Sequence, residues 1–267
     1  MSVAAAGRAL QRAQWRAWYS FLSWYSSRAG ARFSCMNWGY DDGRALVDEG
    51  AGPERYPLQL YAALVEGVPL EGKVLVDVSC GRGGGLAYLA RAHQPARAVG
   101  LDFTPAHVEV CRGTVQREVP SLELEVGDAE ALPLPDASAD VLLSVEASHC
   151  YGSYARFLDE ARRVLRPGGV LLWTDFAPRQ KDRELSRLAR DRFVVDTERD
   201  ITAHVLSAME KDAPRRIEII ERHSARLLRP VFRNFAAADE RCDTVRRFRS
   251  GDHVYFLRRL RCPGVDP

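Results

Sequence analysis

The chain has 267 residues, and its 38 Lys plus Arg and 36 Asp plus Glu leave a net charge of +2 at pH 7. This near balance gives no support for a nucleic-acid-binding protein or for a polybasic membrane-binding protein. The sequence has no run of eighteen apolar residues, which excludes a membrane-spanning helix, and its length fits one α/β domain with additional segments.

The cysteines are scattered, without a CxxC pair and without the spacing of metal ligands: Cys35, Cys80, Cys111, Cys150, Cys242 and Cys262. We therefore expect packing cysteines in a reducing compartment, and no metal site. Because no cleavable signal peptide is recognisable, we expect a soluble, cytoplasmic protein.

Residues 1–56 are expected to form a helical and aromatic lid segment. Within residues 1–34, apolar and aromatic side chains recur at spacings of three and four, which predicts a helix. This stretch contains Trp15, Trp18, Tyr19, Phe21, Leu22, Trp24 and Tyr25 among Arg8, Arg12, Arg16 and Arg28. Two compatible interpretations follow: a helix packed on the domain, and an aromatic lid over an apolar substrate or a face that contacts lipid.

Residues 57–180 are expected to form a ligand-binding core that begins with a helix at 57–68. The aliphatic run 74–78, which contains Asp77, is typical of a strand buried on both faces of a parallel sheet. The glycines that follow it suit a tight turn into a helix, where a ligand can approach the backbone N–H groups. Several nucleotide-binding folds share such a turn, so the later elements decide between them.

Three later signals separate these folds. Strand 97–102 ends in Asp102, whose carboxylate can accept both hydroxyls of a ribose, in NAD and in S-adenosylmethionine alike. Strand 122–126 is followed by Gly-Asp-Ala, and Leu-Arg-Pro-Gly-Gly at 165–169 precedes a further strand. This ordered set resembles the class I S-adenosylmethionine-dependent methyltransferases. The resemblance implies an α/β fold with a Rossmann-like, doubly wound sheet, and S-adenosyl-L-methionine as cofactor.

A fourth strand is expected at 139–144. The segment after it contains the candidate catalytic residue, His149. The carboxyl ends of parallel strands form the ligand crevice of an open α/β sheet, and a neutral histidine there can act as general base. Residues 181–229 show helical apolar stripes and are expected to form a helical cap inserted over the crevice. Residues 230–267 should complete the core with a strand at 253–260, and the pattern leaves 230–250 open between strand and helix.

Several sequence stretches are also similar to the phthiotriolone/phenolphthiotriolone dimycocerosates methyltransferase family. They are NWGY, VDVSCGRGGGLAYLA, GDAEALPLP, VEASHCY, ARFLDEARRVLRPGG, ITAHVL and ERH. The resemblance runs from about residue 35 to the C-terminus and is densest over 74–178. Enzymes of that family O-methylate a hydroxyl on a long polyketide-derived lipid. The N-terminal helix and the cap, which would set the acceptor, match less strongly.

The resemblance implies a set of cofactor-binding residues. Asp77, Ser79, Gly81 and Gly83 would hold the methionine portion; Asp102 the ribose; Phe103, Asp128 and Ala129 the adenine. We further expect Glu146 to contact the adenosine side through its main chain. Either Trp38 or Tyr40 is expected to cover the sulfonium, because a cation is stabilised beside an aromatic face.

Together these features predict an S-adenosylmethionine-dependent O-methyltransferase for a hydroxyl of an apolar small molecule, such as a polyketide, a lipid or another secondary metabolite. The expected partners are that acceptor and, transiently, a membrane surface, but no nucleic acid; the oligomeric state is left open. The alternatives are a C- or N-methyltransferase of a small metabolite and a non-catalytic S-adenosylmethionine-binding protein. Leu86 disfavours an NAD-dependent oxidoreductase, because the dinucleotide fingerprint requires Gly or Ala there.

Overall fold

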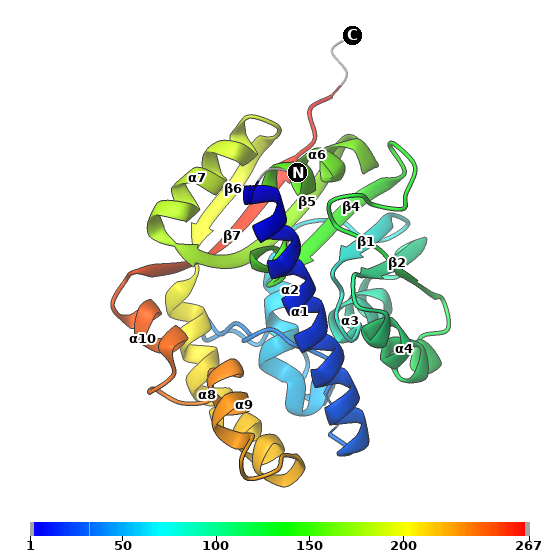
Figure 1. Ribbon diagram of the computed structural model, residues 1–267. Helices are drawn as coiled ribbons and strands as arrows, with labels where there is room; N and C mark the ends of the chain where they lie inside the picture. The colour runs from blue at the N-terminus through cyan, green and yellow to red at the C-terminus, as the bar shows by residue number, and fades with distance from the viewer. Residues whose placement is uncertain (1–2, 32, 265–267) are drawn as a thin grey trace.

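A computed structural model describes residues 3–31 and 33–264 of the chain (Figure 1). Seven strands form a sheet: β1 (Val74–Val78), β2 (Arg97–Asp102), β3 (Leu122–Val126), β4 (Ala139–Val145), β5 (Leu165–Pro178), β6 (Val194–Asp200) and β7 (His253–Arg261). Their spatial order is β3-β2-β1-β4-β5-β7-β6; β1 to β5 run parallel, and β7 runs antiparallel to both of its neighbours. This arrangement confirms the predicted Rossmann-like doubly wound sheet, in which the strand order reverses between β1 and β4.

The helices cover the sheet and the carboxyl ends of its strands. They are α1 (Val3–Arg28), α2 (Arg55–Val65), α3 (Gly84–His93), α4 (Pro105–Gly113), α5 (Val115–Glu118), α6 (Tyr154–Val164), α7 (Arg179–Arg190), α8 (Thr202–His223), α9 (Arg229–Phe235) and α10 (Asp243–Arg249), with short 3₁₀ turns η1 (Glu49–Glu54) and η2 (Ser148–Cys150). Figure 1 shows α1, in dark blue, crossing the front of the molecule, with α8 to α10 beside it in yellow and orange. No helix among the described residues is long and apolar enough to span a bilayer.

Alternate residues of the central strands enter two different layers of the core. Leu75 and Leu143 pack in the layer that contains α2 and α3, whereas Val76 and Leu142 pack in the layer that contains α6 and α7. This alternation follows from the two-residue period of a strand, and it explains why both faces of the strands are apolar in the sequence. The six cysteines, all among the described residues, are free thiols, and five of them are buried.

The expected helical cap at 181–229 is wrong for its first part, because α7 packs on one face of the sheet and Val194–Asp200 forms β6 at the edge of the sheet. The stretch is largely exposed, and its alternate residues Asp196, Glu198 and Asp200 are acidic, so it lacks the apolar run of a buried strand. Its pairing partner β7 supplies Arg258, whose Nε donates to Glu198 at 2.8 Å. The region 230–250, which the sequence left open between strand and helix, contains most of α9 and all of α10.

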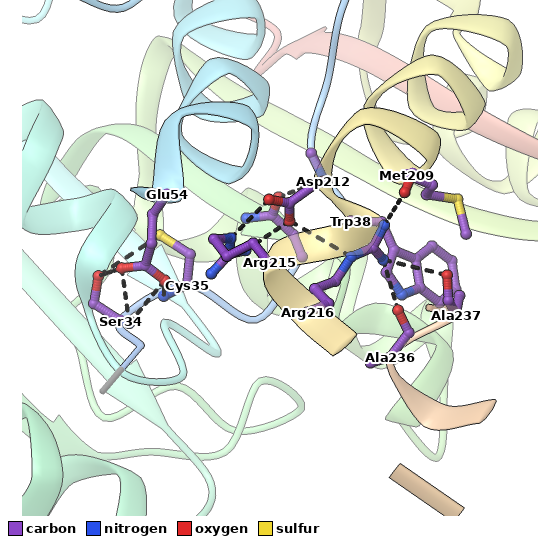
Figure 2. A network of polar contacts seen from close by, with 12 residues as sticks. Ser34, Cys35, Trp38, Glu54, Met209, Asp212, Arg215, Arg216, Ala236 and Ala237 are labelled. Atoms are coloured by element: carbon purple, nitrogen blue, oxygen red, sulfur yellow. Dashed lines mark hydrogen bonds and ion pairs between the residues drawn. The ribbon is translucent and has the colours of Figure 1, made fainter. Parts of the chain in front are cut away.

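A buried network of polar contacts holds α8 against its neighbours (Figure 2). Asp212 on α8 accepts from Nε and Nη2 of Arg215, at 2.7 and 2.6 Å. Arg216 donates to the carbonyl oxygen of Ala236 at 2.6 Å and to that of Met209. Because a buried guanidinium that loses its partners is costly, these contacts fix α8 against the segment that follows α9.

The loop before α2 is fixed by Glu54. Its carboxylate accepts from the backbone nitrogen of Ser34 at 2.9 Å and from that of Cys35 at 3.0 Å (Figure 2). Ser34, Cys35 and the nearby Trp38 line the cavity described next, so both networks shape its wall.

Candidate active site

A cavity of about 830 Å³ lies at the carboxyl ends of the central strands, between the sheet, α1 and the α8–α10 segment. Its size is within the usual range for small-molecule sites. Nine of the twelve residues that the sequence analysis selected lie in its wall: Trp38, Ser79, Gly81, Asp102, Phe103, Asp128, Ala129, Glu146 and His149. The topology thus brings together residues from five separate segments of the chain.

The turn between β1 and α3 requires its small residues. Ser79 and Gly81 both have a positive φ, at 66° and 58°. A Cβ atom on Gly85 would lie 2.1 Å from the ring of Tyr61, and one on Gly84 would lie 2.2 Å from Oγ of Ser34. Gly84 and Gly85, at the start of α3, are therefore packed too closely against Ser34 and Tyr61 for side chains of their own. The Ser79 hydroxyl lies 3.0 Å from the Tyr151 hydroxyl.

Asp102, the expected ribose-binding acid, is held at the end of β2. It accepts from the backbone nitrogens of Gly81 at 2.9 Å and Thr104 at 2.8 Å. Nδ1 of His107, a residue that the sequence analysis did not select, lies 3.2 Å from its Oδ1. Two carboxylate oxygens offer about four acceptor sites, so Asp102 keeps capacity for a ribose hydroxyl.

Replacing Asp102 by Ala should weaken binding of S-adenosylhomocysteine. One ribose hydrogen bond at about 0.5–1.5 kcal/mol corresponds to a Kd roughly 2 to 13 times larger. Titration calorimetry on this variant, with Asp159→Ala at the exposed surface as control, measures the change. An unchanged Kd in Asp102→Ala would contradict the ribose assignment.

The expected adenine side is contacted by α1. Nη2 of Arg12 lies 2.5 Å from Oδ2 of Asp128, and Nη1 lies 3.2 Å from Oε1 of Glu130. The guanidinium carbon of Arg12 lies 4.8 Å from the centre of the Phe103 ring, and that of Arg16 lies 5.1 Å from it. An adenine ring at this position must therefore share Asp128 and Phe103 with α1, which the sequence did not indicate.

Three of the twelve predicted residues, Tyr40, Asp77 and Gly83, do not line this cavity among the described residues. Tyr40 is buried, and its ring lies 5.1 Å from that of His204, so Trp38 is the aromatic residue of that loop that lines the cavity. Asp77 lies beneath the turn, where burial raises the pKa of its carboxyl to about 8. A Cβ on Gly83 would lie 2.8 Å from a methyl carbon of Val115, so this glycine is needed for packing.

His149 is paired with Asp175, at the end of β5. Nδ1 of His149 lies 2.9 Å from Oδ1 of Asp175, and the backbone nitrogen of His149 donates to Oδ2 at 2.9 Å. Ser148 and the backbone nitrogen of Phe176 also donate to this carboxylate, at 2.6 and 2.8 Å. Asp175 is thus fully oriented, and it leaves Nε2 as the His149 nitrogen free for a ligand.

The electrostatics of this pair follow from its burial. Burial lowers the pKa of His149, but the adjacent Asp175 carboxylate outweighs it and raises that pKa well above its usual range. Burial raises the pKa of Asp175, but the His149 imidazole and the hydrogen bonds to the carboxylate lower it overall. Asp175 was not among the residues predicted from the sequence, although an acid near the carboxyl end of the fifth parallel strand could have indicated it.

Glu146 lines the cavity, and its side chain holds neighbouring segments together. Its Oε2 accepts from the backbone nitrogen of Trp38 at 2.9 Å and from the Tyr255 hydroxyl at 2.7 Å. Its own backbone nitrogen donates to Thr174 at 2.8 Å, and its φ of 49° is unusual for a non-glycine residue. Burial raises the pKa of this carboxyl to about 8. Glu146 therefore ties the Trp38 loop to β7 beside His149.

The rest of the cavity wall comes from α1 and the α8–α10 segment. It includes Trp15, Tyr19, Leu22 and Tyr25 on α1, and Ile219, Ile220, Phe232 and Phe235 on the other side. The Trp15 ring lies 5.9 Å from the His149 ring. These side chains form an apolar half of the cavity beside His149. Asp102, Asp128 and Glu130 line another part of the wall, which α1 also reaches through Arg12.

Comparisons with known proteins agree with this arrangement. A family described as "Methyltransferase domain" matches residues 76–173. The chain is 36% identical over 225 residues to a phthiotriol/phenolphthiotriol dimycocerosates methyltransferase of Mycobacterium leprae, covering 83% of this chain and 82% of that one. It is 36% identical over 207 residues to a fatty-acid O-methyltransferase of Mycolicibacterium smegmatis, covering 76% and 75%. The structure of a geranyl diphosphate methyltransferase in complex with S-adenosylmethionine matches in fold, with a TM-score of 0.66 at 20% identity, covering 86% of this chain and all of that one.

Proposed function

This chain belongs to the phthiotriol/phenolphthiotriol dimycocerosates methyltransferase family of S-adenosylmethionine-dependent enzymes, and we propose that it methylates a hydroxyl group of a long apolar acceptor. The observation that carries this proposal is the pair His149–Asp175 at the junction between the cofactor-binding wall and an apolar half of the same cavity. A lipid or polyketide chain fits that half by its chemistry, and the relatives named for lipid substrates support the same acceptor class.

The residues of this chain that hold the cofactor are, in this proposal, Ser79, Gly81, Asp102, Phe103 and Asp128. They fit the group because two carboxylates, a hydroxyl and an aromatic ring line the same cavity, and these groups can accept from ribose and adenine and pack against the base. When bound, S-adenosylmethionine supplies an electrophilic methyl group on a sulfonium sulfur. The departing thioether is neutral, so the protein needs no acid for the leaving group.

The chain must align the acceptor hydroxyl and remove its proton. As the oxygen–carbon bond forms and the carbon–sulfur bond breaks, Nε2 of His149 takes the hydroxyl proton. Asp175 holds the imidazole through Nδ1 and stabilises the imidazolium that results. The cover formed by α1 and α8–α10 excludes water and positions the acceptor, which is the larger part of catalysis in such a displacement.

The proposal is tested by product analysis with S-adenosylmethionine that carries a deuterated methyl group. A long-chain 1,3-diol and a fatty acid of matched length, each dispersed in detergent, serve as acceptors. We expect the label in a methyl ether of the diol, identified by mass spectrometry. A label found only on carbon or nitrogen of other metabolites would contradict the hydroxyl assignment.

A carboxylate acceptor is a second candidate, because Asp175 raises the pKa of His149. A protonated His149 would bind a carboxylate rather than deprotonate a hydroxyl, and one relative is named for fatty-acid O-methylation. A methyl ester of the fatty acid, with no ether from the diol, would favour this reaction over the first.

Methyl transfer should be insensitive to chelators. No group of three or more His, Cys, Asp or Glu side chains among the described residues is arranged to hold a metal ion. We expect equal turnover before and after treatment with EDTA. If EDTA abolished turnover and magnesium restored it, a metal ion would take part in the reaction, and proton transfer to His149 alone would not explain catalysis.

A further inference from the structure

An exposed apolar patch, which we call the tip patch, lies at one end of the molecule, where α1 ends and the α8–α9 turn begins. It consists of Phe21, Trp24, Leu227 and Val231, with exposed fractions of 36%, 55%, 92% and 50%. Seven large apolar side chains are exposed among the described residues, and these four are the majority of them. Figure 1 shows the end of α1 and the α8–α9 turn at the same, lower end of the molecule. Such grouping on one surface is unusual for side chains exposed by chance.

Direct contacts join the two elements of the tip patch. The backbone nitrogen of Ala225 donates to the Tyr25 hydroxyl at 2.7 Å, and Nδ1 of His223 lies 2.7 Å from the carbonyl oxygen of Ala29. The Tyr25 ring lies 5.4 Å from the Phe232 ring and 5.7 Å from the Phe21 ring. The exposed side chains therefore belong to one continuous surface.

Positive charges surround the tip patch. Residues 17–31 and 217–233 contain five arginines, Arg28, Arg222, Arg226, Arg229 and Arg233, against two glutamates, Glu218 and Glu221. Glu218 pairs with Arg222 at 3.4 Å and Glu221 pairs with Arg233, so five positive charges less two negative ones leave a net charge of +3. The guanidinium of Arg28 lies 5.4 Å from the centre of the Trp24 ring, so a positive charge directly adjoins an exposed aromatic side chain. Apolar side chains that enter the acyl boundary, with arginines at the level of the phosphates, are typical of a protein face that lies on an anionic bilayer.

The same end of the molecule reaches the cavity. Tyr25, Ile220, His223, Ser224 and Phe232 all line it, and they lie directly behind the tip patch. We propose that the tip patch docks on the surface of a bilayer that carries anionic lipids. Docking in this way would place this end of the cavity next to the bilayer from which an apolar acceptor comes.

A bilayer fits this surface better than a second copy of the chain. Two copies facing each other through the tip patch would bring the same arginines together, and such like charges repel. An anionic bilayer instead supplies the opposite charge around an apolar centre. The inference concerns binding and goes beyond the reaction, because the protein can dock on a bilayer whichever atom it methylates.

The test is co-sedimentation of the full chain with vesicles of phosphatidylcholine alone and with vesicles that contain phosphatidylglycerol. We expect binding to the second kind, weakened by salt and reduced on the order of tenfold in Trp24→Ser/Leu227→Ser and in Arg222→Ala/Arg226→Ala. The matched control is Leu10→Ser, which replaces an equally exposed side chain at the other end of α1 and should bind like the wild type. Unchanged melting and S-adenosylhomocysteine binding show that each variant is folded.

Three outcomes would overturn the proposal. The wild type stays in solution with phosphatidylglycerol vesicles; Leu10→Ser loses as much binding as the tip variants; or size-exclusion chromatography shows a dimer that the tip variants abolish. Turnover of a detergent-dispersed acceptor by the tip variants should equal that of the wild type. That measurement separates a failure of docking from a failure of the proposed reaction.

Discussion

Replacing His149 by Ala should lower kcat by about 10²–10⁴-fold, the usual contribution of a positioned general base. Binding of S-adenosylhomocysteine should change little, because the cofactor-binding wall lies on other strand ends. Single-turnover kinetics on the diol and calorimetry with S-adenosylhomocysteine measure the two effects separately. His93→Ala, which replaces a histidine outside this cavity, is the matched control and should retain wild-type rates.

The dependence of kcat on pH distinguishes proton transfer from a merely structural role for His149. A general base acts only when neutral, so the rate should fall as pH falls through its pKa. Because Asp175 raises that pKa, this limb should lie above pH 6.5. In Asp175→Asn the negative charge is lost, the pKa of His149 falls, and the limb should move to lower pH while the maximum rate decreases.

Two results would contradict the proposed roles of His149 and Asp175. A limb that stays at the same pH in Asp175→Asn would show that another group titrates, and Glu146, beside His149 with a pKa of about 8, is the first to examine. A His149→Ala variant with nearly wild-type kcat would indicate a phenolic or enolic acceptor, or catalysis by proximity alone. In either case the methyltransferase assignment would stand, since it depends on the fold and the family.

The wall of the cavity that we propose to bind the cofactor could be predicted from the sequence, because the features that form it are local. A buried parallel strand is apolar throughout, the turn after it needs small residues, and Asp102 follows its own strand directly. Each of these features is visible as a pattern within a few consecutive residues. The order of these patterns along the chain predicted the sheet topology, because parallel strands joined by helices have few possible arrangements.

The features that the sequence did not reveal depend on contacts between distant residues. Asp175 acquires its role only when the end of β5 lies beside η2, and Arg12 meets Asp128 across 116 residues. The edge strand β6 is polar, so only its pairing with β7 identifies it. The arginines around the tip patch come from segments far apart in the chain. The net charge of +2 does not reveal them, because acids elsewhere in the chain offset their charge.

Deleting residues 1–30 should abolish or strongly weaken turnover while largely preserving S-adenosylhomocysteine binding. Trp15, Tyr19, Leu22 and Tyr25 form one side of the apolar half of the cavity, so their loss exposes the acceptor to water. The acids that hold the cofactor belong to the core, and removal of Arg12 frees Asp128 rather than damaging it.

The deletion also removes Ser26, whose hydroxyl accepts from the buried guanidinium of Arg82, so some loss of stability is expected. A cooperative melt must therefore be shown first, and Trp15→Ala provides a milder variant. Its side chain contacts the His149 ring and should affect kcat on the apolar acceptor, whereas Leu10→Ala on the same helix should not. Detergent-dispersed acceptor keeps membrane docking out of the comparison. Wild-type turnover by a folded, truncated protein would show that α1 is a packing element and that the acceptor is bound by the α8–α10 segment alone.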